Sequence, residues 1–277
     1  MNNIEQFSRH IRLPSFGPEG QKKISRAEVA IVGAGGLGSP SAIYLAATGI
    51  GSIGLIDSDS VEISNLPRQI LYNQHNLDEM KVTAAGKRLK EINPCLKLNI
   101  FTDRLKYDNV VKIIKDYDIV IDGSDNFATK FLLNDACVIN KIPLIHAGVV
   151  RYNGQVMTII PYQSACYRCI FPEPPPANTI PTCREAGILN TVAGIIGLIQ
   201  ATEAIKIIIK AGKLLTNRLI VFDALEMNFR TIEIKRSNNC PVCSKRATIK
   251  TIKDETTRFH KISTRLLRNK FPHPKIL

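Results

Sequence analysis

The sequence predicts an α/β fold, in which a doubly wound parallel sheet continues into a mixed or antiparallel second half. Two observations support this prediction. Short apolar runs alternate with segments of helical spacing from residue 28 to residue 146. After Ala147 this rhythm changes, and the remaining strand-like segments look like a more antiparallel second half with one long helix among them. A strand–helix rhythm of the first kind is typical of a parallel sheet with helices on both faces.

The first half, about residues 1–147, supplies the parallel strands and their helices. The expected strands are residues 28–32, 53–56, 97–102, 118–121 and 143–146. The expected helices are residues 39–48, 81–92, 108–115 and 127–140. Gly49 and Pro94 follow two of these helices, as expected for residues that end helical segments.

The second half, about residues 148–243, is expected to contain strands at 154–160, 218–223 and 229–235 and a long helix at 189–210. Residues 172–181, PEPPPANTIP, contain too many prolines for a helix or an inner strand and predict a mobile crossover loop. Residues 244–277 form a basic C-terminal tail with ten Lys or Arg against two Asp or Glu. The halves and the tail are the expected organisation of the chain.

Composition and charge narrow the class of protein. The chain has 277 residues, of which 44% are hydrophobic, enough for a sizeable core. The net charge of +13 suggests nucleic-acid binding, but +8 of it lies in the tail, and basic tails are often solvated ends. The longest apolar stretch, residues 192–209, is interrupted by Gln200, Thr202, Glu203 and Lys206, which favours a buried helix over a membrane span.

The N-terminal residues show no secretory signal, and seven cysteines then indicate a reducing compartment. We expect a cytoplasmic protein, or one of an organelle stroma if the chain is organelle-encoded. The spacing Cys-x-x-Cys occurs twice, at Cys166/Cys169 and Cys240/Cys243. Two such pairs are a strong signature of a tetrahedral structural Zn²⁺ site, which here would join two distant segments and leave no open position for catalysis.

The other cysteines and the histidines give weaker signals. Cys137 falls among apolar residues of a predicted helix and is expected in the core. Cys183 follows the proline-rich loop beside Arg184, and both a structural and a reactive role are open for it. His146 ends a strand, and we expect a buried, hydrogen-bonded histidine there rather than a ligand.

A glycine-rich motif follows the first strand and opens the first helix. Residues 33–38, GAGGLG, place Gly33, Gly35, Gly36 and Gly38 in the pattern G-x-G-x-x-G. Glycines there let phosphates approach the backbone at a helix N-terminus, as in a Rossmann-like fold. Asp57 ends the next strand, about twenty residues on, where a carboxylate binds ribose hydroxyls. The motif predicts nucleotide binding but does not separate NAD from ATP.

A second group of polar residues separates the two nucleotides. Arg68 and Lys81 supply cations suited to a triphosphate. Carboxylates suited to Mg²⁺ accompany them. This combination beside the glycine loop favours ATP over NAD. The residues of the group are Asp57, Asp59, Asn65, Arg68, Gln69, Lys81, Asp125 and Asn126.

Several motifs, in this order, closely resemble those of the MoeB/ThiF adenylyltransferases, relatives of the ubiquitin-activating enzymes. They are GAGGLGSP, IDSDSVEISNLPRQIL, DGSDNFATKFLLNDAC, CYRCIFPEPPP, TCREAG, QATEAIK and CPVC, and the resemblance covers about residues 7–243. It implies a homodimer, ATP, Mg²⁺, structural zinc and a small ubiquitin-like sulfur carrier protein that ends in Gly-Gly. The implied reaction is adenylylation of that C-terminal glycine, with release of pyrophosphate, for sulfur transfer in molybdopterin or thiamine biosynthesis.

The resemblance also implies roles for single residues. It puts Gly36 at the phosphates, Asp57 at the ribose and Asp125 at the magnesium. Arg9, in the segment FSRHI, would reach the ATP of the neighbouring subunit, and Cys183 matches a cysteine that binds the carrier or sulfur in some members only. The residues implied around the triphosphate are Asn65, Arg68, Gln69 and Lys81.

Two departures from the family pattern and three alternatives remain. Pro67 stands where glutamine is common, and only 34 residues follow Cys243, so we expect a separate sulfurtransferase to deliver any sulfur. The alternatives are an NAD-dependent oxidoreductase, a nucleic-acid-binding protein that uses the basic tail, and a tRNA-modifying relative. The two Cys-x-x-Cys pairs and TCREAG argue against the last of these.

Overall fold

A computed structural model describes residues 5–176 and 183–252 of the chain, with the side chains of Cys183 and Arg184 excepted. The predicted crossover loop at 172–181 and the basic tail at 244–277 therefore lie partly outside the described residues, and the mobility of the loop stays a prediction.

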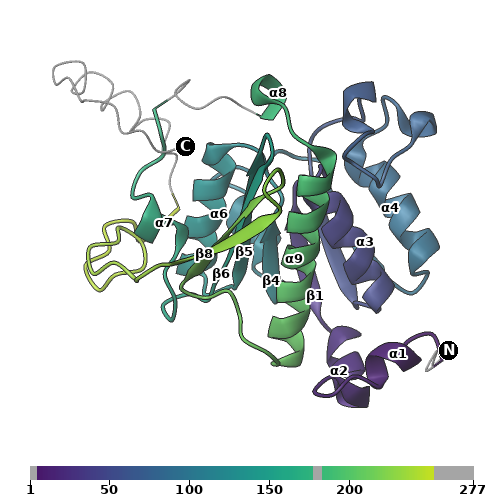
Figure 1. Cartoon of the computed structure of the whole chain (residues 1–277), viewed down its shortest axis with the longest axis horizontal. Helices are drawn as coiled ribbons and strands as arrows, with labels where there is room; N and C mark the ends of the chain where they lie inside the picture. The colour runs from purple at the N-terminus through teal and green to yellow at the C-terminus, as the bar shows by residue number, and fades with distance from the viewer. Residues whose placement is uncertain (1–4, 177–182, 253–277) are drawn as a thin grey trace.

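The described residues form one eight-stranded sheet in the order β3-β2-β1-β4-β5-β6-β7-β8 (Figure 1). Pairing is parallel from β3 to β5 and antiparallel from β5 to β8. This confirms the predicted change from a parallel to an antiparallel half. The strands are β1 Glu28–Val32, β2 Ser52–Ile56, β3 Lys97–Phe101, β4 Ile119–Asp122, β5 Leu144–Val150, β6 Asn153–Ile159, β7 Arg218–Asp223 and β8 Asn228–Glu233.

All five predicted helices are present, within a few residues of the expected ends. The predicted helix at 108–115 is shorter, Val110–Ile114, because Asn109 uses its side chain to hold the preceding turn at Lys106. The helices are α1 Ser8–Ile11, α2 Gly17–Ile24, α3 Gly38–Thr48, α4 Lys81–Ile92, α5 Val110–Ile114, α6 Phe127–Ile139, α7 Tyr167–Ile170, α8 Cys183–Ala186 and α9 Asn190–Ile209, with 3₁₀ turns η1 Ile63–Asn65 and η2 Gln74–Asn76.

The sequence gives little sign of α1, α2, α7 and α8. Three of them are single turns of four residues, too short for a recognisable apolar period. The fourth, α2, has only Gly20 and Ile24 buried, and it packs against α1 and α9 below the sheet (Figure 1). These helices owe their structure to tertiary contacts rather than to local pattern.

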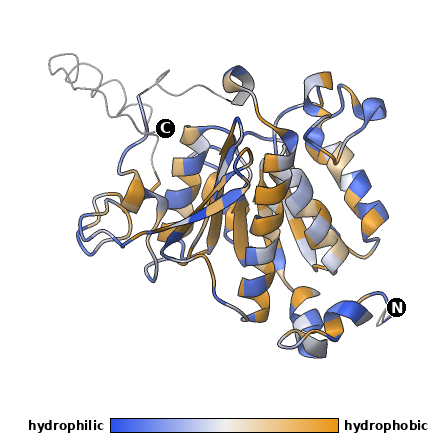
Figure 2. Ribbon diagram, viewed as in Figure 1, coloured by the Kyte–Doolittle hydropathy of each residue, from blue (hydrophilic) through white to orange (hydrophobic). Residues whose placement is uncertain are grey.

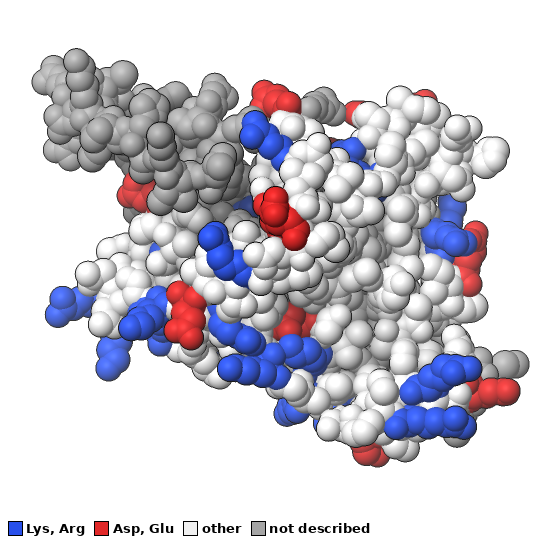
Figure 3. Space-filling view, in the orientation of Figure 1, with Lys and Arg blue, Asp and Glu red and all other residues white. Residues whose placement is uncertain are grey.

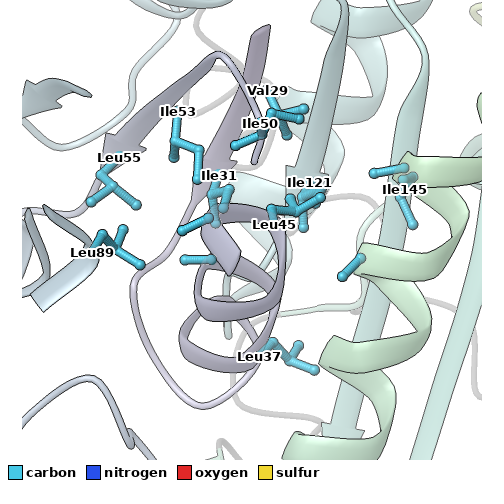
Figure 4. Close-up of a cluster of buried hydrophobic side chains, with 14 of the residues drawn as sticks. Val29, Ile31, Leu37, Leu45, Ile50, Ile53, Leu55, Leu89, Ile121 and Ile145 are labelled. Atoms are coloured by element: carbon cyan, nitrogen blue, oxygen red, sulfur yellow. The ribbon is translucent and has the colours of Figure 1, made fainter. Parts of the chain in front are cut away.

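The core lies on both faces of the parallel half. Figure 4 shows the cluster between the sheet and α3, where Val29, Ile31 and Ile53 meet Leu45. Every residue of β2 and β4 is buried, as expected for strands covered on both faces. Figure 2 shows the same strands as the hydrophobic interior of the molecule.

The long helix α9 completes this layer. Its length and mean hydropathy of 1.8 would suffice to cross a membrane, but in the structure it packs against α3, β5 and β6. Gln200 and Glu203 are buried on the side that faces the sheet, and both form hydrogen bonds there. The structure thus gives α9 the place of a core helix, as its polar residues predict.

Candidate functional site: a nucleotide crevice and a four-cysteine centre

The glycine motif lies at the point where the parallel sheet changes its direction of winding. The chain leaves β1 toward β2 on one side and reaches β4 on the other, so the loops after β1 and β4 diverge at the carboxyl ends of neighbouring strands. Nucleotides bind at such switch points in open α/β sheets. Gly33 has a φ of 92°, and a Cβ there would lie 2.6 Å from the carbonyl oxygen of Gly123. Glycine is therefore required for the two loops to approach each other.

Asp57, at the end of β2, braces the glycine loop from the side. Its carboxylate accepts hydrogen bonds from the backbone N–H groups of Ala34 at 2.8 Å and of Asp59 at 2.9 Å. Burial raises the pKa of Asp57, although the Lys81 ammonium and these two bonds work against that rise. Both carboxylate oxygens of Asp57 therefore hold backbone segments in place, and its role at the ribose stays a prediction.

Lys81 is held at the same edge by an ion pair. Its Nζ lies 2.9 Å from Oδ2 of Asp59, and the side chain of Lys81 is only 7% exposed while that of Asp59 is 69% exposed. Lys81 opens α4, and its backbone N–H donates to the Asp59 carbonyl at 2.9 Å. The cation is therefore placed beside the glycine loop with a carboxylate that solvent or a metal ion can reach.

Another side of the crevice is formed by Arg68, Gln69 and Asn65. The Arg68 side chain lies beside Gly36, and Gln69 lies beside Gly35. Asn65 is buried and caps its own 3₁₀ turn by accepting from the Glu62 N–H at 3.2 Å, so its part in binding is indirect in this structure. The Oε1 atom of Gln69 is buried without a hydrogen-bond partner among the described residues, which leaves it free for a ligand.

Asp125 projects from the loop after β4. It is exposed, and no hydrogen bond or ion pair of its carboxylate is found among the described residues, so both oxygens are free for a cation. Asn126 serves the fold instead, because its side chain accepts from the Thr129 N–H at 2.9 Å and caps α6. The residues that the sequence placed around a nucleotide thus meet at one edge of the sheet, with Asn65 and Asn126 as supports.

Beneath Asp125 lies a buried charged cluster that the sequence did not predict. Asp122 ends β4 and lies 3.1 Å from Nζ of Lys130 and 2.8 Å from Nδ1 of His146. Burial alone would raise the pKa of Asp122, but Lys130 and His146 hold it well below its usual range. His146 is buried as expected, and its Nδ1 has a partner. The expected buried, hydrogen-bonded histidine is therefore confirmed, although Nε2 of His146 has no partner among the described residues.

Arg9 does not reach the crevice of its own chain. It lies in α1, and the neighbouring Phe7 packs against Gly49 at the C-terminal end of α3, whereas the glycine loop is at the N-terminal end of that helix. A helix of eleven residues is about 16 Å long. The two ends are also apart in Figure 1, where α1 lies at the bottom. Any contact between Arg9 and a nucleotide needs a second copy of the chain.

Two residues of α9 belong to the crevice although no motif marked them. Asn190 donates from Nδ2 to the carbonyl of Pro67 at 3.0 Å, and Ala193 lies next to Gly36. Tyr72 likewise donates to the Ala34 carbonyl at 2.7 Å and steadies the glycine loop. The sequence does not mark these residues, because they are far from the glycine motif along the chain and meet it only in the folded structure. Cys183 opens α8, and its side chain lies outside the described residues.

The four cysteines of the two Cys-x-x-Cys pairs come together. Their sulfur atoms all lie within 4.8 Å of one another, with Cys166–Cys240 at 3.5 Å and Cys169–Cys243 at 3.4 Å. These distances are far from the ~2.05 Å of a disulfide and close to the ~3.8 Å between sulfurs that tetrahedral Zn–S bonds of ~2.3 Å require. The residues fit a Zn²⁺ ion, as the sequence predicts.

The protein around the cysteines supports a thiolate centre. Backbone N–H groups of Ser237 and Cys243 donate to the sulfurs of Cys169 and Cys240 at 3.4 Å. Arg168, between the first two cysteines, forms a bidentate ion pair with Asp135 of α6 at 2.7 to 3.0 Å. The centre is therefore tied both to the β8 end of the sheet and to the helix that follows Asp125.

Comparison with known proteins identifies relatives over nearly the whole length. The ThiF family profile matches residues 7–242. A protein of Thermus thermophilus named "Sulfur carrier protein adenylyltransferase" is 40% identical over 91% of this chain and 94% of its own length. The "SAMP-activating enzyme E1" of Haloferax volcanii is 40% identical over 87% and 88%. "Adenylyltransferase and sulfurtransferase MOCS3" of Culex quinquefasciatus is 42% identical, but the chain spans only 56% of it.

Solved structures show the same fold. The crystal structure of E. coli MccB with AMPCPP and MccA superposes with a TM-score of 0.77 at 26% identity, over 88% of this chain and 75% of MccB. A second MccB structure, in complex with N-formylated MccA, gives a TM-score of 0.78 at 25% identity.

Proposed function

Because this chain belongs to the ThiF family, we propose that it is an adenylyltransferase that activates the C-terminal glycine of a ubiquitin-like sulfur carrier protein with ATP. The observation that carries the proposal is the crevice at the switch point, where the glycine loop, Asp57 and Lys81 converge. The names of the two relatives that match over nearly their full lengths support the same substrate class. The proposed carrier ends in Gly-Gly, and molybdopterin and thiamine biosynthesis are both compatible with it.

The chemistry follows from charge and position. The terminal carboxylate of the carrier attacks the α-phosphate of ATP, the bond to the β-phosphate breaks, and pyrophosphate leaves with its electron pair. A carboxylate is already ionised at neutral pH, so the step needs no general base. Arg68 and Lys81 would then bind the phosphates and stabilise the charge that develops on them. The product is a mixed anhydride that a sulfur nucleophile can attack.

Mg²⁺ is proposed to bind at the exposed carboxylate of Asp125, because oxygen ligands are the ones that it prefers, with the exposed Asp59 as a second candidate ligand. When bound there it would neutralise phosphate charge. Arg9 is proposed to complete the site from the neighbouring subunit of a homodimer, since it is remote from its own crevice. A cytoplasmic or stromal location and a separate sulfurtransferase complete the proposal.

ATP–pyrophosphate exchange tests the function directly. We expect exchange only when a carrier with a C-terminal Gly-Gly and Mg²⁺ are both present, and no exchange with a carrier that lacks the two glycines. Turnover of NADH in place of ATP would instead support the oxidoreductase alternative. Pull-down of the carrier from the source cell would identify the pathway.

A second candidate activity, nucleic-acid binding, rests on the uneven distribution of charge. Residues 205–277 contain 17 Lys or Arg against five Asp or Glu and so hold +12 of the net +13. On the face in Figure 3, basic side chains gather at the lower left and lower centre, around the end of α9 and the last strands. Among the described residues, Lys210, Lys235 and Lys245 form no ion pair. Such a surface favours phosphate backbones.

Binding of a short RNA hairpin at several salt concentrations tests this activity. Lys210→Glu with Lys245→Glu should weaken binding and lower its salt dependence by about two ions. The matched control, Lys112→Glu with Lys115→Glu in the nucleotide-binding half, should have little effect. Equal effects of both pairs, or no binding by the unmodified protein at low salt, would leave the tail as a solvated end.

A further inference from the structure

The buried charged cluster of Asp122, Lys130 and His146 lies beneath the loop of Asp125, and a contribution to stability does not account for it. The side chains of Asp122 and His146 are 0% and 1% exposed, and that of Lys130 is 8% exposed. Removing two charges from water offsets most of the attraction between them, so a buried ion pair is weak evidence for a stabilising role. The cluster nevertheless lies at the carboxyl end of β4, immediately before the loop that carries Asp125.

The two carboxylate oxygens of Asp122 face in different directions. Oδ1 accepts from Ser124 twice, from the backbone N–H at 3.0 Å and from the hydroxyl at 2.6 Å. Since Ser124 directly precedes Asp125, these bonds fix the backbone from which the Asp125 carboxylate projects. Oδ2 instead accepts from Lys130, whose Nζ also donates to the Ala147 carbonyl at 2.6 Å, and so links the loop to β5.

His146 extends this link toward the four-cysteine centre. Its ring lies 4.2 Å, centroid to centroid, from the ring of Tyr167, the residue that follows Cys166. The Tyr167 backbone N–H is itself held by Oδ1 of Asn134 on α6 at 2.8 Å. Burial lowers the pKa of His146, so the ring is neutral at pH 7 and donates from Nδ1 to Asp122. A continuous series of contacts therefore runs from Cys166 through Tyr167, His146 and Asp122 to Ser124.

We propose that Asp122, Lys130 and His146 form a positioning unit that sets the place of Asp125 in the crevice and couples it to the segment of the zinc ligand Cys166. All three side chains are buried, and in this proposal each acts through Ser124 and Asp125. The inference rests on the proposed function, because that function gives Asp125 its task. Loss of a hydrogen bond within the positioning unit should raise the Mg²⁺ concentration needed for nucleotide binding. The affinity for metal-free nucleotide should stay nearly unchanged.

Ser124→Ala is the cleanest test, because it removes one hydrogen bond of the unit without leaving a buried charge unpaired. The matched control is Thr158→Val, which also removes a buried hydroxyl, one that donates to the Glu203 carboxylate at 2.5 Å instead of to Asp122. For Ser124→Ala we expect the Mg²⁺ concentration that half-saturates binding of a non-hydrolysable ATP analogue to rise about tenfold, as for a lost bond to a charged group. For Thr158→Val we expect no change.

Two further variants test the link to the zinc segment. His146→Phe keeps a ring against Tyr167 but loses the bond to Asp122, and Tyr167→Leu loses the ring contact. Both should shift the Mg²⁺ dependence in the same direction as Ser124→Ala, by a smaller factor, in protein that still contains one zinc per chain.

Calorimetric binding separates this inference from the proposed function. If the unmodified protein catalyses carrier-dependent exchange but Ser124→Ala and Thr158→Val have the same Mg²⁺ dependence, the positioning unit is refuted and the function stands. If the unmodified protein catalyses no exchange, the proposed function fails first. A shift with Ser124→Ala but none with His146→Phe or Tyr167→Leu would remove the coupling to the zinc segment.

Discussion

The parallel part of the sheet, β1 to β5, and the antiparallel part, β6 to β8, are stabilised in different ways. In the parallel part, β2 and β4 are buried along their whole length between two layers of helices, and only the edge strand β3 has no buried residue. In the antiparallel part, β6 is buried at five of seven residues, but β7 is buried at only two of six and β8 is exposed at every residue. A strand with both faces near solvent gains little from the hydrophobic effect. The four-cysteine centre lies at this weaker end of the sheet.

The two halves of the chain also differ in charge. Residues 1–147 contain 17 Lys or Arg against 16 Asp or Glu, whereas residues 148–277 contain 20 against eight. The part with balanced charge carries most of the candidate crevice, including the ion pair of Lys81 with Asp59. One continuous sheet thus carries the candidate nucleotide crevice in one part and the four-cysteine centre beside the other. The following predictions test that contrast.

Loss of the metal should give the largest effect on stability, and we expect that effect to be confined to the antiparallel part of the sheet. Cys240→Ser is expected to lose zinc and most of the stability of the antiparallel part, since structural zinc binding in small domains is worth about 10 kcal/mol or more. Hydrogen exchange should then rise in β7 and β8 and stay slow in β1, β2 and β4. The exposed Cys95→Ser serves as the control and should retain zinc. Metal-free protein with unchanged protection everywhere would show that the cysteines do not hold the antiparallel part.

Asp125→Ala should abolish activity without loss of stability, because the residue is exposed and its carboxylate has no partner among the described residues. We expect pyrophosphate exchange to fall by about a hundredfold or more, as for loss of a group that stabilises transition-state charge. Thermal unfolding should be unchanged. Asp116→Ala, also exposed, should retain full exchange. Near-normal exchange by Asp125→Ala would overturn the magnesium assignment.

Mixed dimers test whether Arg9 acts across subunits. Arg9→Ala and Asp125→Ala chains should each be inactive alone. Random mixing in a twofold dimer gives one intact composite site in each heterodimer, so about a quarter of the normal activity should return. Subunit exchange must be verified by mass spectrometry of tagged chains. No recovery despite exchange would exclude the role in trans.

Cys183→Ala should give the smallest effect. Adenylation needs no nucleophile from the enzyme, so exchange should stay within about twofold of normal. A defect should appear only when complete sulfur transfer is measured with a donor present. Lost exchange in a folded variant would mean that α8 contributes to the crevice itself, and full sulfur transfer would leave Cys183 a structural residue.

Local pattern alone determined much of this protein. The glycine motif and Asp57 are close in sequence, and each directly follows a short apolar strand. The apolar pattern therefore predicts the strands, and the spacing predicts that the motif and Asp57 meet at the carboxyl edge of the sheet. The paired Cys-x-x-Cys spacing predicted the metal centre for a similar reason, since metal coordination restricts residue type and separation more than packing does.

Only the tertiary structure decided which residues support those motifs. Asn190 meets Pro67, and His146 meets Asp122, through contacts between elements 24 to 123 positions apart in the chain. No local period records such contacts, because they depend on how α9 and β5 pack against the end of β4. The distance of Arg9 from its own crevice has the same origin. The sequence shows that an arginine is present in α1, but only packing places α1 beside the C-terminal end of α3, away from the glycine loop.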